Sequence, residues 1–155
     1  MKIGITRIDH PLAHGAEVTD AELWDFPEGL IGLPDHRRFA LVALPEAPPF
    51  QLLASLDDPG FGLVVVDPTV LVPKYTLSIS ARQLSPLVER DPDRLVVVVP
   101  VVLPGRSTPL SLNLKGPILL SPSERRGLQR VSPDDSHSVR HVLDFGGAGA
   151  AACSS

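Results

Sequence analysis

The sequence contains little cysteine, few aromatic residues and no long apolar run, and each of these absences excludes a class of protein or fold. A single cysteine, Cys153, excludes a disulfide within the chain. Aromatic residues make up only 5% of the chain, so the core must be built from leucine and valine. No run approaches the ~18 consecutive apolar residues that a membrane-spanning helix needs. The first ten residues lack the apolar centre of a secretory signal, and we therefore expect a cytoplasmic protein with no membrane contact.

Proline and glycine are abundant by comparison. The 155 residues include 17 prolines and 12 glycines, which favour short strands and many turns over long helices. The length suits one domain, which we place at residues 1–143, followed by a flexible Gly/Ala/Ser tail at residues 144–155. We predict an all-β fold, a small twisted antiparallel sheet of about ten short strands that closes toward a barrel, with one short helix.

The stretch SLDDPGFGLVVVDP at residues 55–68 is the centre of this prediction. Its four consecutive apolar residues at 63–66 are typical of a strand buried on both faces. Residues 50–56 form a second apolar run, so the two predicted strands meet at the DDPG turn. The most apolar segment, residues 95–103, predicts another central strand, with a bulge or strand end near Pro100 because proline lacks a backbone N–H.

Weaker patterns place the remaining elements. Trp24 is expected to be a core anchor, and Ser80 is expected to cap the one clear helix, at residues 81–84. Leu30, Ile31 and Leu33 are expected to pack beneath the sheet. A single helical turn is predicted at residues 35–38. Further strands are predicted at residues 2–8, within 17–26, and at 39–44, 74–79, 111–114, 117–120 and 127–131.

The net charge of −4 conceals an asymmetry between the two halves of the chain. Residues 1–73 carry four basic and eleven acidic side chains, a formal charge of −7, whereas residues 74–155 carry +3. No basic residue occurs between Arg38 and Lys74. An acidic face around the DDPG turn would attract a basic partner and repel phosphate backbones, so direct nucleic-acid binding is not expected.

The sequence offers no strong catalytic constellation. It has no nucleophile elbow, phosphate loop or His-Glu-x-x-His motif. Asp57 and Asp58 are adjacent and would point to opposite sides of an extended chain, which is poor geometry for shared acid–base work. His137 and His141 stand four residues apart beside Asp134, and only a helix would bring them together for a metal. We predict no enzyme, no cofactor and no metal, with a metal-dependent hydrolase as a minor alternative.

Five short motifs occur together in one order. They are FPEGL at residues 26–30, SLDDP at 55–59, VVVDP at 64–68, NLKGPILL at 113–120 and VRH at 139–141. With these motifs, residues 1–143 resemble the flagellar assembly factor FliW family. Gly116 departs from the pattern, since the family usually has alanine at that place in the motif.

The resemblance implies a cytoplasmic bacterial protein without enzymatic activity. Members of the family bind flagellin and the translational repressor CsrA, a small basic RNA-binding dimer. Sequestering the repressor frees flagellin mRNA for translation, and free flagellin takes the factor back. We expect this chain to act in the same way, as a monomer. A small-barrel nucleic-acid-binding module is the alternative, although the sequence lacks the stacking aromatics that such modules use.

The acidic stretch and the resemblance together suggest candidate protein-binding residues. We place the repressor-binding face at the DDPG turn and just after it. Phe61 is either an exposed anchor or a core residue at the base of the hairpin. Two further candidates come from the NLK motif, where Asn113 is also suited to support the turn backbone. The candidates are Glu46, Asp57, Asp58, Phe61, Asp67, Asn113 and Lys115.

Overall fold

Most of the regular structure in this chain is β-strand. The computed structural model describes residues 4–84, 87 and 91–143. The strands in this part are β1 (Ile5–Arg7), β2 (Glu17–Thr19), β3 (Leu23–Asp25), β4 (Arg38–Ala43), β5 (Gln51–Ser55), β6 (Gly62–Val66), β7 (Val96–Val102), β8 (Ser111–Leu112), β9 (Ile118–Ser121), β10 (Arg126–Gln129) and β11 (His141–Val142). Helical structure consists of α1 (Pro68–Leu71) and 3-10 turns at Pro11–Ala13, Asp20–Glu22, Ala81–Leu84 and Pro92–Arg94.

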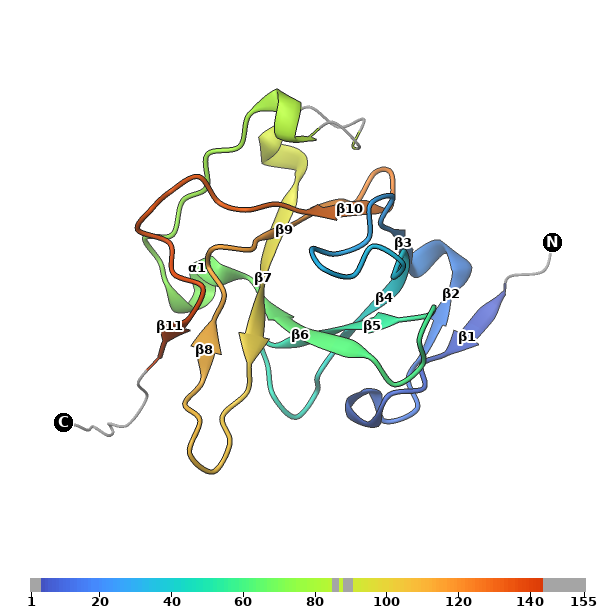
Figure 1. Cartoon of the computed structure of the whole chain (residues 1–155). Helices are drawn as coiled ribbons and strands as arrows, with labels where there is room; N and C mark the ends of the chain where they lie inside the picture. The colour runs from blue at the N-terminus through green and yellow to red at the C-terminus, as the bar shows by residue number, and fades with distance from the viewer. Residues whose placement is uncertain (1–3, 85–86, 88–90, 144–155) are drawn as a thin grey trace.

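Seven of the strands close into a barrel (Figure 1). The order is β7-β6-β5-β4-β3-β10-β9, and β9 pairs back onto β7. All of these pairings are antiparallel except that of β10 with β3, which is parallel and rests on Arg126 opposite Asp25. Strands β8 and β11 extend the sheet beyond β7, and β1 and β2 form a separate ribbon. The prediction of a barrel-like all-β fold is confirmed.

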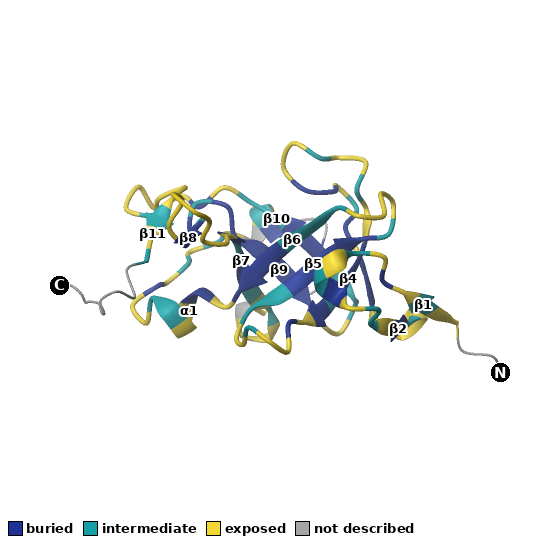
Figure 2. Cartoon of the chain, turned by 90° about the horizontal axis from the view of Figure 1, so that it is seen from below, coloured by how far each residue is buried: buried dark blue, intermediate teal, exposed yellow. Residues whose placement is uncertain are grey.

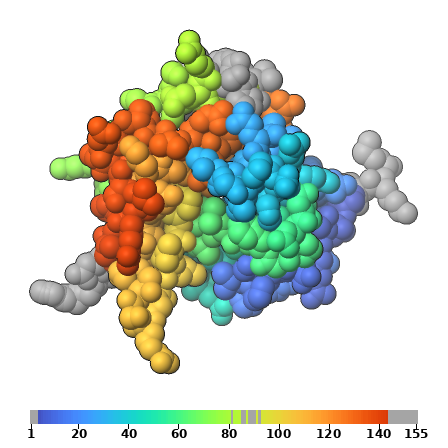
Figure 3. Space-filling view, in the orientation of Figure 1, coloured from blue at the N-terminus to red at the C-terminus, as the bar shows by residue number. Residues whose placement is uncertain are grey.

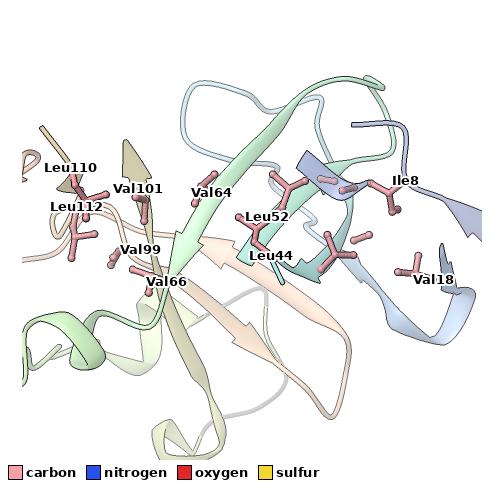
Figure 4. Close-up of a cluster of buried hydrophobic side chains, with 14 of the residues drawn as sticks. Ile8, Val18, Leu44, Leu52, Val64, Val66, Val99, Val101, Leu110 and Leu112 are labelled. Atoms are coloured by element: carbon pink, nitrogen blue, oxygen red, sulfur yellow. The ribbon is translucent and has the colours of Figure 1, made fainter. Parts of the chain in front are cut away.

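The central strands are buried on both faces, as their valine-rich sequences predict. On β6, Val65 packs with Phe26 inside the barrel, whereas Val64 and Val66 belong to a second cluster outside it. Figure 4 shows that outer cluster, which extends from Ile8 and Val18 at one end to Leu110 and Leu112 at the other. The ribbon of β1 and β2 and the extension of β8 and β11 therefore cover the outside of the barrel. Seen from below, the buried strands lie at the centre and the exposed loops surround them (Figure 2).

Pro100 lies inside β7 without interrupting it. Its C=O accepts a hydrogen bond from the N–H of Asn113 at 2.8 Å. In a strand, the N–H and C=O of one residue point to the same side. The missing N–H of Pro100 would therefore point to the edge of β7 at the place where its partner changes from β9 to β8, so no ladder hydrogen bond is lost. The predicted strand is confirmed, but the chain needs no bulge or strand end because the partner changes instead.

Several local predictions are corrected. The α-helix is at Pro68–Leu71, where Asp67 caps it and proline occupies its first turn. The segment after Ser80 is a 3-10 turn, and Ser80 Oγ caps it by accepting from the N–H of Gln83. Residues 74–79 are not a strand and residues 35–38 are not a helical turn, whereas the unpredicted strand β11 pairs with β8. The predicted tail, with Cys153, lies outside the described residues.

The loop at residues 27–37, here called the bridging loop, positions the candidate sites. On one side the N–H groups of Arg37 and Arg38 donate to Asp57 in the turn between β5 and β6. On the other side the N–H of Ile31 donates to the Gln129 side chain at 3.0 Å. Leu30 is buried as predicted, but Ile31 is 54% exposed. The loop therefore lies between the turn and the C-terminal part of the sheet.

Candidate protein-binding surfaces

The turn between β5 and β6 is organised by the hydroxyl of Ser55. Ser55 Oγ accepts from the N–H groups of Asp57 and Asp58, each at 3.1 Å, and lies 3.0 Å from His36 Nδ1. With its acceptor capacity taken by two backbone donors, the hydroxyl donates to the imidazole. This buried serine holds the turn in one conformation.

Asp57 anchors that turn although it is exposed. Its Oδ2 accepts from the N–H of Arg37 at 2.7 Å and of Arg38 at 2.9 Å. Burial raises the pKa of the Asp57 carboxyl, but the hydrogen bonds from these two backbone groups outweigh that effect and leave its pKa below the ordinary value. The carboxylate thus fastens the turn to the start of β4.

Asp57 and Asp58 are both exposed on this turn, which also carries Phe61. Phe61 is half-buried, packs against the interior cluster and meets the His36 ring edge-on, with 4.8 Å between ring centroids. Its position falls between the two predicted roles, since one part of the ring packs inward and the other part faces solvent. We call Asp58 and Phe61, with His36 beside them, the acidic tip.

Glu46 and Asp67 lie away from the acidic tip. The tip precedes β6 and Asp67 follows it, so the two are at opposite ends of that strand. Asp67 Oδ1 accepts from the N–H and the hydroxyl of Thr69 at 2.9 and 2.7 Å, which is the cap of α1. Glu46 lies in the loop between β4 and β5, 3.2 Å from His14 Nε2. The fold brings Asp57, Asp58 and Phe61 together and separates them from Glu46 and Asp67.

Asn113 and Lys115 form a third location, in the turn between β8 and β9. Asn113 Oδ1 accepts from the N–H of Lys115 at 3.1 Å, which is the turn-supporting role expected for this asparagine. Lys115 Nζ donates to the C=O of Asp134 at 3.0 Å. Both side chains line a groove of about 330 Å³ together with Ile31, Val131 and Val139. Ile31 is expected from the sequence to pack beneath the sheet, and no sequence pattern predicts that it meets Val131 and Val139, because the three residues come from widely separated segments.

His137, near the C-terminus, has a packing role. The segment that carries His137 is a loop, so the helix that would pair it with His141 does not form. His137 Nδ1 lies 2.6 Å from Ser132 Oγ, and its ring stacks on Tyr75 at 4.6 Å. Within residues 4–84, 87 and 91–143, no group of three or more His, Cys, Asp and Glu side chains is placed to hold a metal ion.

These features define a class of protein. The chain is a small closed β-barrel protein that is packed on both faces of its sheet. The family model for FliW protein matches residues 8–143, and the chain belongs to the FliW family. It is thus a member of a family of flagellar assembly factors.

Individual relatives agree with this assignment. The chain is 30% identical over 128 residues to the flagellar assembly factor FliW of Thermotoga sp. (strain RQ2). The aligned residues make up 82% of this chain and 86% of that protein. It is 32% identical over 119 residues to the flagellar assembly factor FliW of Caldanaerobacter subterraneus subsp. tengcongensis, and the aligned residues make up 76% of this chain and 79% of that protein. A crystal structure of the flagellar assembly factor FliW matches 90% of this chain and 96% of its own, with a TM-score of 0.78 and 22% identity, which supports the fold.

The described part of the chain contains no helix with the length and apolar character needed to span a membrane.

Proposed function

We propose that this protein binds flagellin and the translational repressor CsrA in the bacterial cytoplasm, and that it relieves repression of flagellin mRNA without catalysing a reaction. The observation that carries the proposal is the match of the FliW family model to residues 8–143. Free flagellin competes for the protein and returns the repressor to its mRNA, so that flagellin synthesis follows demand.

The acidic tip is the proposed contact for the basic repressor. Asp58 is an exposed carboxylate, and Phe61 beside it offers part of an aromatic ring that the interior cluster already holds in place. A pre-ordered aromatic side chain next to a charge loses little conformational entropy on binding. Asp57 supports this contact by holding the turn. Glu46 and Asp67, at the other end of β6, belong to a more distant part of the same acidic half and contribute through long-range attraction.

A gel-shift experiment tests the proposal. Labelled flagellin mRNA leader is mixed with CsrA, and the purified protein is added at about physiological salt, followed by flagellin. We expect the protein to dissociate the repressor–RNA complex and the addition of flagellin to restore it. Persistence of that complex at a molar excess of the protein would contradict the proposal. Direct shifting of the RNA by the protein alone would favour the nucleic-acid-binding alternative.

A further inference from the structure

Three exposed branched side chains meet in the groove between the bridging loop and the C-terminal segment. Ile31 is 54%, Val131 57% and Val139 66% exposed, and all three line the same groove of about 330 Å³. A second hollow of about 410 Å³ adjoins it and shares Ile31 and Gln129. In Figure 3 the light-blue bridging loop meets the orange-red C-terminal segment on the face turned to the viewer. Solvent-exposed apolar side chains gathered in this way mark a contact surface.

The floor of the groove presents amide N–H groups. Asn113 Oδ1 accepts from the N–H of Lys115, which fixes the orientation of that amide and turns Nδ2 toward Gly116. Gln129 is fixed likewise, since Oε1 accepts from Ile31 N–H and Nε2 donates to the C=O of Gly116 at 2.9 Å. A β-carbon added to Gly116 would lie 2.9 Å from Asn113 Nδ2 and 3.0 Å from Gln129 Nε2. The absence of a side chain at Gly116 therefore leaves both amide nitrogens close to the groove.

The groove contains a cation, Lys115, whose Nζ also donates to the C=O of Asp134 and interacts with the carboxylate of that residue. Lys115 is the one charged side chain among the described residues that line the 330 Å³ part. In the adjoining hollow, Arg130 and Glu28 neutralise one another at 2.8 Å. A cation and amide donors on the floor, with aliphatic side chains on the walls, complement an acceptor that carries negative charge and has apolar neighbours.

We propose that this groove binds a partner segment in which a carboxylate is flanked by aliphatic side chains. The carboxylate accepts hydrogen bonds from Asn113 Nδ2 and Lys115 Nζ, and the aliphatic neighbours pack on Ile31, Val131 and Val139. The groove is separate from the acidic tip and opposite to it in charge, so it selects a different kind of partner. This goes beyond the contact proposed for the basic repressor and does not depend on it.

A peptide titration followed by NMR tests the inference. The full chain, labelled with ¹⁵N, is titrated to about 5 mM with a capped hexapeptide that has one aspartate between leucines, and with the same peptide carrying asparagine instead. We expect the amide signals of Ile31, Gly116 and Gln129 to shift with the aspartate peptide. The asparagine peptide should bind at least about threefold more weakly, since it lacks the negative charge of the aspartate.

Matched variants distinguish binding in the groove from non-specific electrostatic and hydrophobic binding elsewhere on the surface. Lys115→Gln should weaken the aspartate peptide about threefold, whereas Lys74→Gln, at an exposed lysine outside the groove, should leave binding unchanged. Val139→Thr should also weaken binding, and Val142→Thr, at a valine that is 49% exposed, should not. Equal binding of both peptides, shifts confined to other residues, or no shifts at the highest concentration would overturn the proposal. A dimer in sedimentation that Ile31→Asp abolishes would instead assign the groove to a second copy of this chain.

Discussion

Asp57 and Asp58 are neighbours in the sequence, yet the fold uses their carboxylates differently. Both residues are exposed, but the Asp57 carboxylate accepts two backbone N–H groups, those of Arg37 and Arg38 at the start of β4. Ser55 accepts from the N–H groups of both residues and so holds the backbone of the turn in place. One acidic residue is thus committed to stability, and the other is free to meet a partner.

Asp57 should make stability depend on acid pH. Because the folded-state pKa of Asp57 is lowered, its contribution to the free energy of unfolding is present above the unfolded pKa and is lost as the pH falls through the folded value. Asp57→Ala should cost about 1 kcal/mol at pH 7 and less in acid, where the carboxyl is protonated in the folded state as well. Urea unfolding at several pH values measures this. Asp58→Ala is the control and should change stability little; an equal loss at both positions would contradict the assigned roles.

Tyr75 presents the opposite case, a buried hydroxyl with no hydrogen-bond partner among the described residues. Burial, with a smaller effect of Asp134, raises the pKa of Tyr75 to about 12. Tyr75→Phe should keep the stacking on His137 and leave stability unchanged or raise it by about 1 kcal/mol, since an unsatisfied polar group is removed.

The same substitution should alter the response to alkali. Folded Tyr75 keeps its proton to a higher pH than an unfolded tyrosine does, so with respect to this group the free energy of unfolding is steady below about pH 10 and falls as the pH rises toward 12. Thermal melts between pH 9 and about pH 11 should show a smaller decline for Tyr75→Phe. A marked loss of stability at neutral pH would show that the hydroxyl has a partner.

At the scale of elements, the position of β10 in the barrel depends on the absence of a side chain at Gly127. Gly127 lies against the ring of Phe26, which is fully buried inside the barrel. A β-carbon at Gly127 would lie 2.5 Å from Phe26 Cζ, and a ring enclosed by the interior cluster has nowhere to move. The close approach of β10 to this ring is what lets the barrel close beside β3.

Gly127→Ala should therefore destabilise the barrel by about 1–3 kcal/mol through overpacking. Denaturant unfolding measures the change in midpoint. Gly105→Ala is the matched control, since its added carbon would come no nearer than 3.8 Å to the neighbouring atoms, and it should stay within about 0.5 kcal/mol of the parent chain. If the two variants unfolded alike, the close approach to Phe26 would not be limiting.

The elements themselves were predictable from sequence to different degrees. Strands β5, β6 and β7 carry long valine- and leucine-rich runs, and both of their faces are buried, so pattern and outcome agree. Residues 74–79 show an equally clear alternation, but no neighbouring strand pairs with them. Strand β11 has only two residues and exists because β8 is there to pair with it. Alternation reports which side chains face inward, whereas a strand also requires a hydrogen-bonding partner.

At the scale of the molecule, the charge asymmetry of the sequence becomes a spatial one. The acidic first half builds β1 to β6 and the more basic second half builds β7 to β11. In Figure 3 the blue and green half lies to the right and the yellow and red half to the left. A basic partner is therefore attracted to the side that carries the acidic tip, and a carboxylate-bearing segment to the groove beside Lys115.

Asp58→Lys should slow association with CsrA about two- to tenfold at low salt, and the difference should narrow at about 0.5 M salt because screening weakens long-range attraction. Stopped-flow or surface-based kinetics across ionic strengths measure the on-rate. Glu46→Lys makes the same change of charge at the other end of β6 and should have the smaller effect. Equal slowing by both variants would mean that net charge alone matters, and no slowing by Asp58→Lys would remove the tip as the contact.

The amino-acid sequence by itself determined the all-β class, the hairpin around the DDPG turn and the separation of charge between the halves. These follow from composition and local period, which act along the chain. The tertiary structure decided which carboxylates bind backbone N–H groups, where the helix lies and how Ile31, Val131 and Val139 come together around Gly116. Those outcomes depend on pairings between segments up to about a hundred residues apart, such as Ile31 with Gln129, and the energy of such contacts is not encoded in any local stretch.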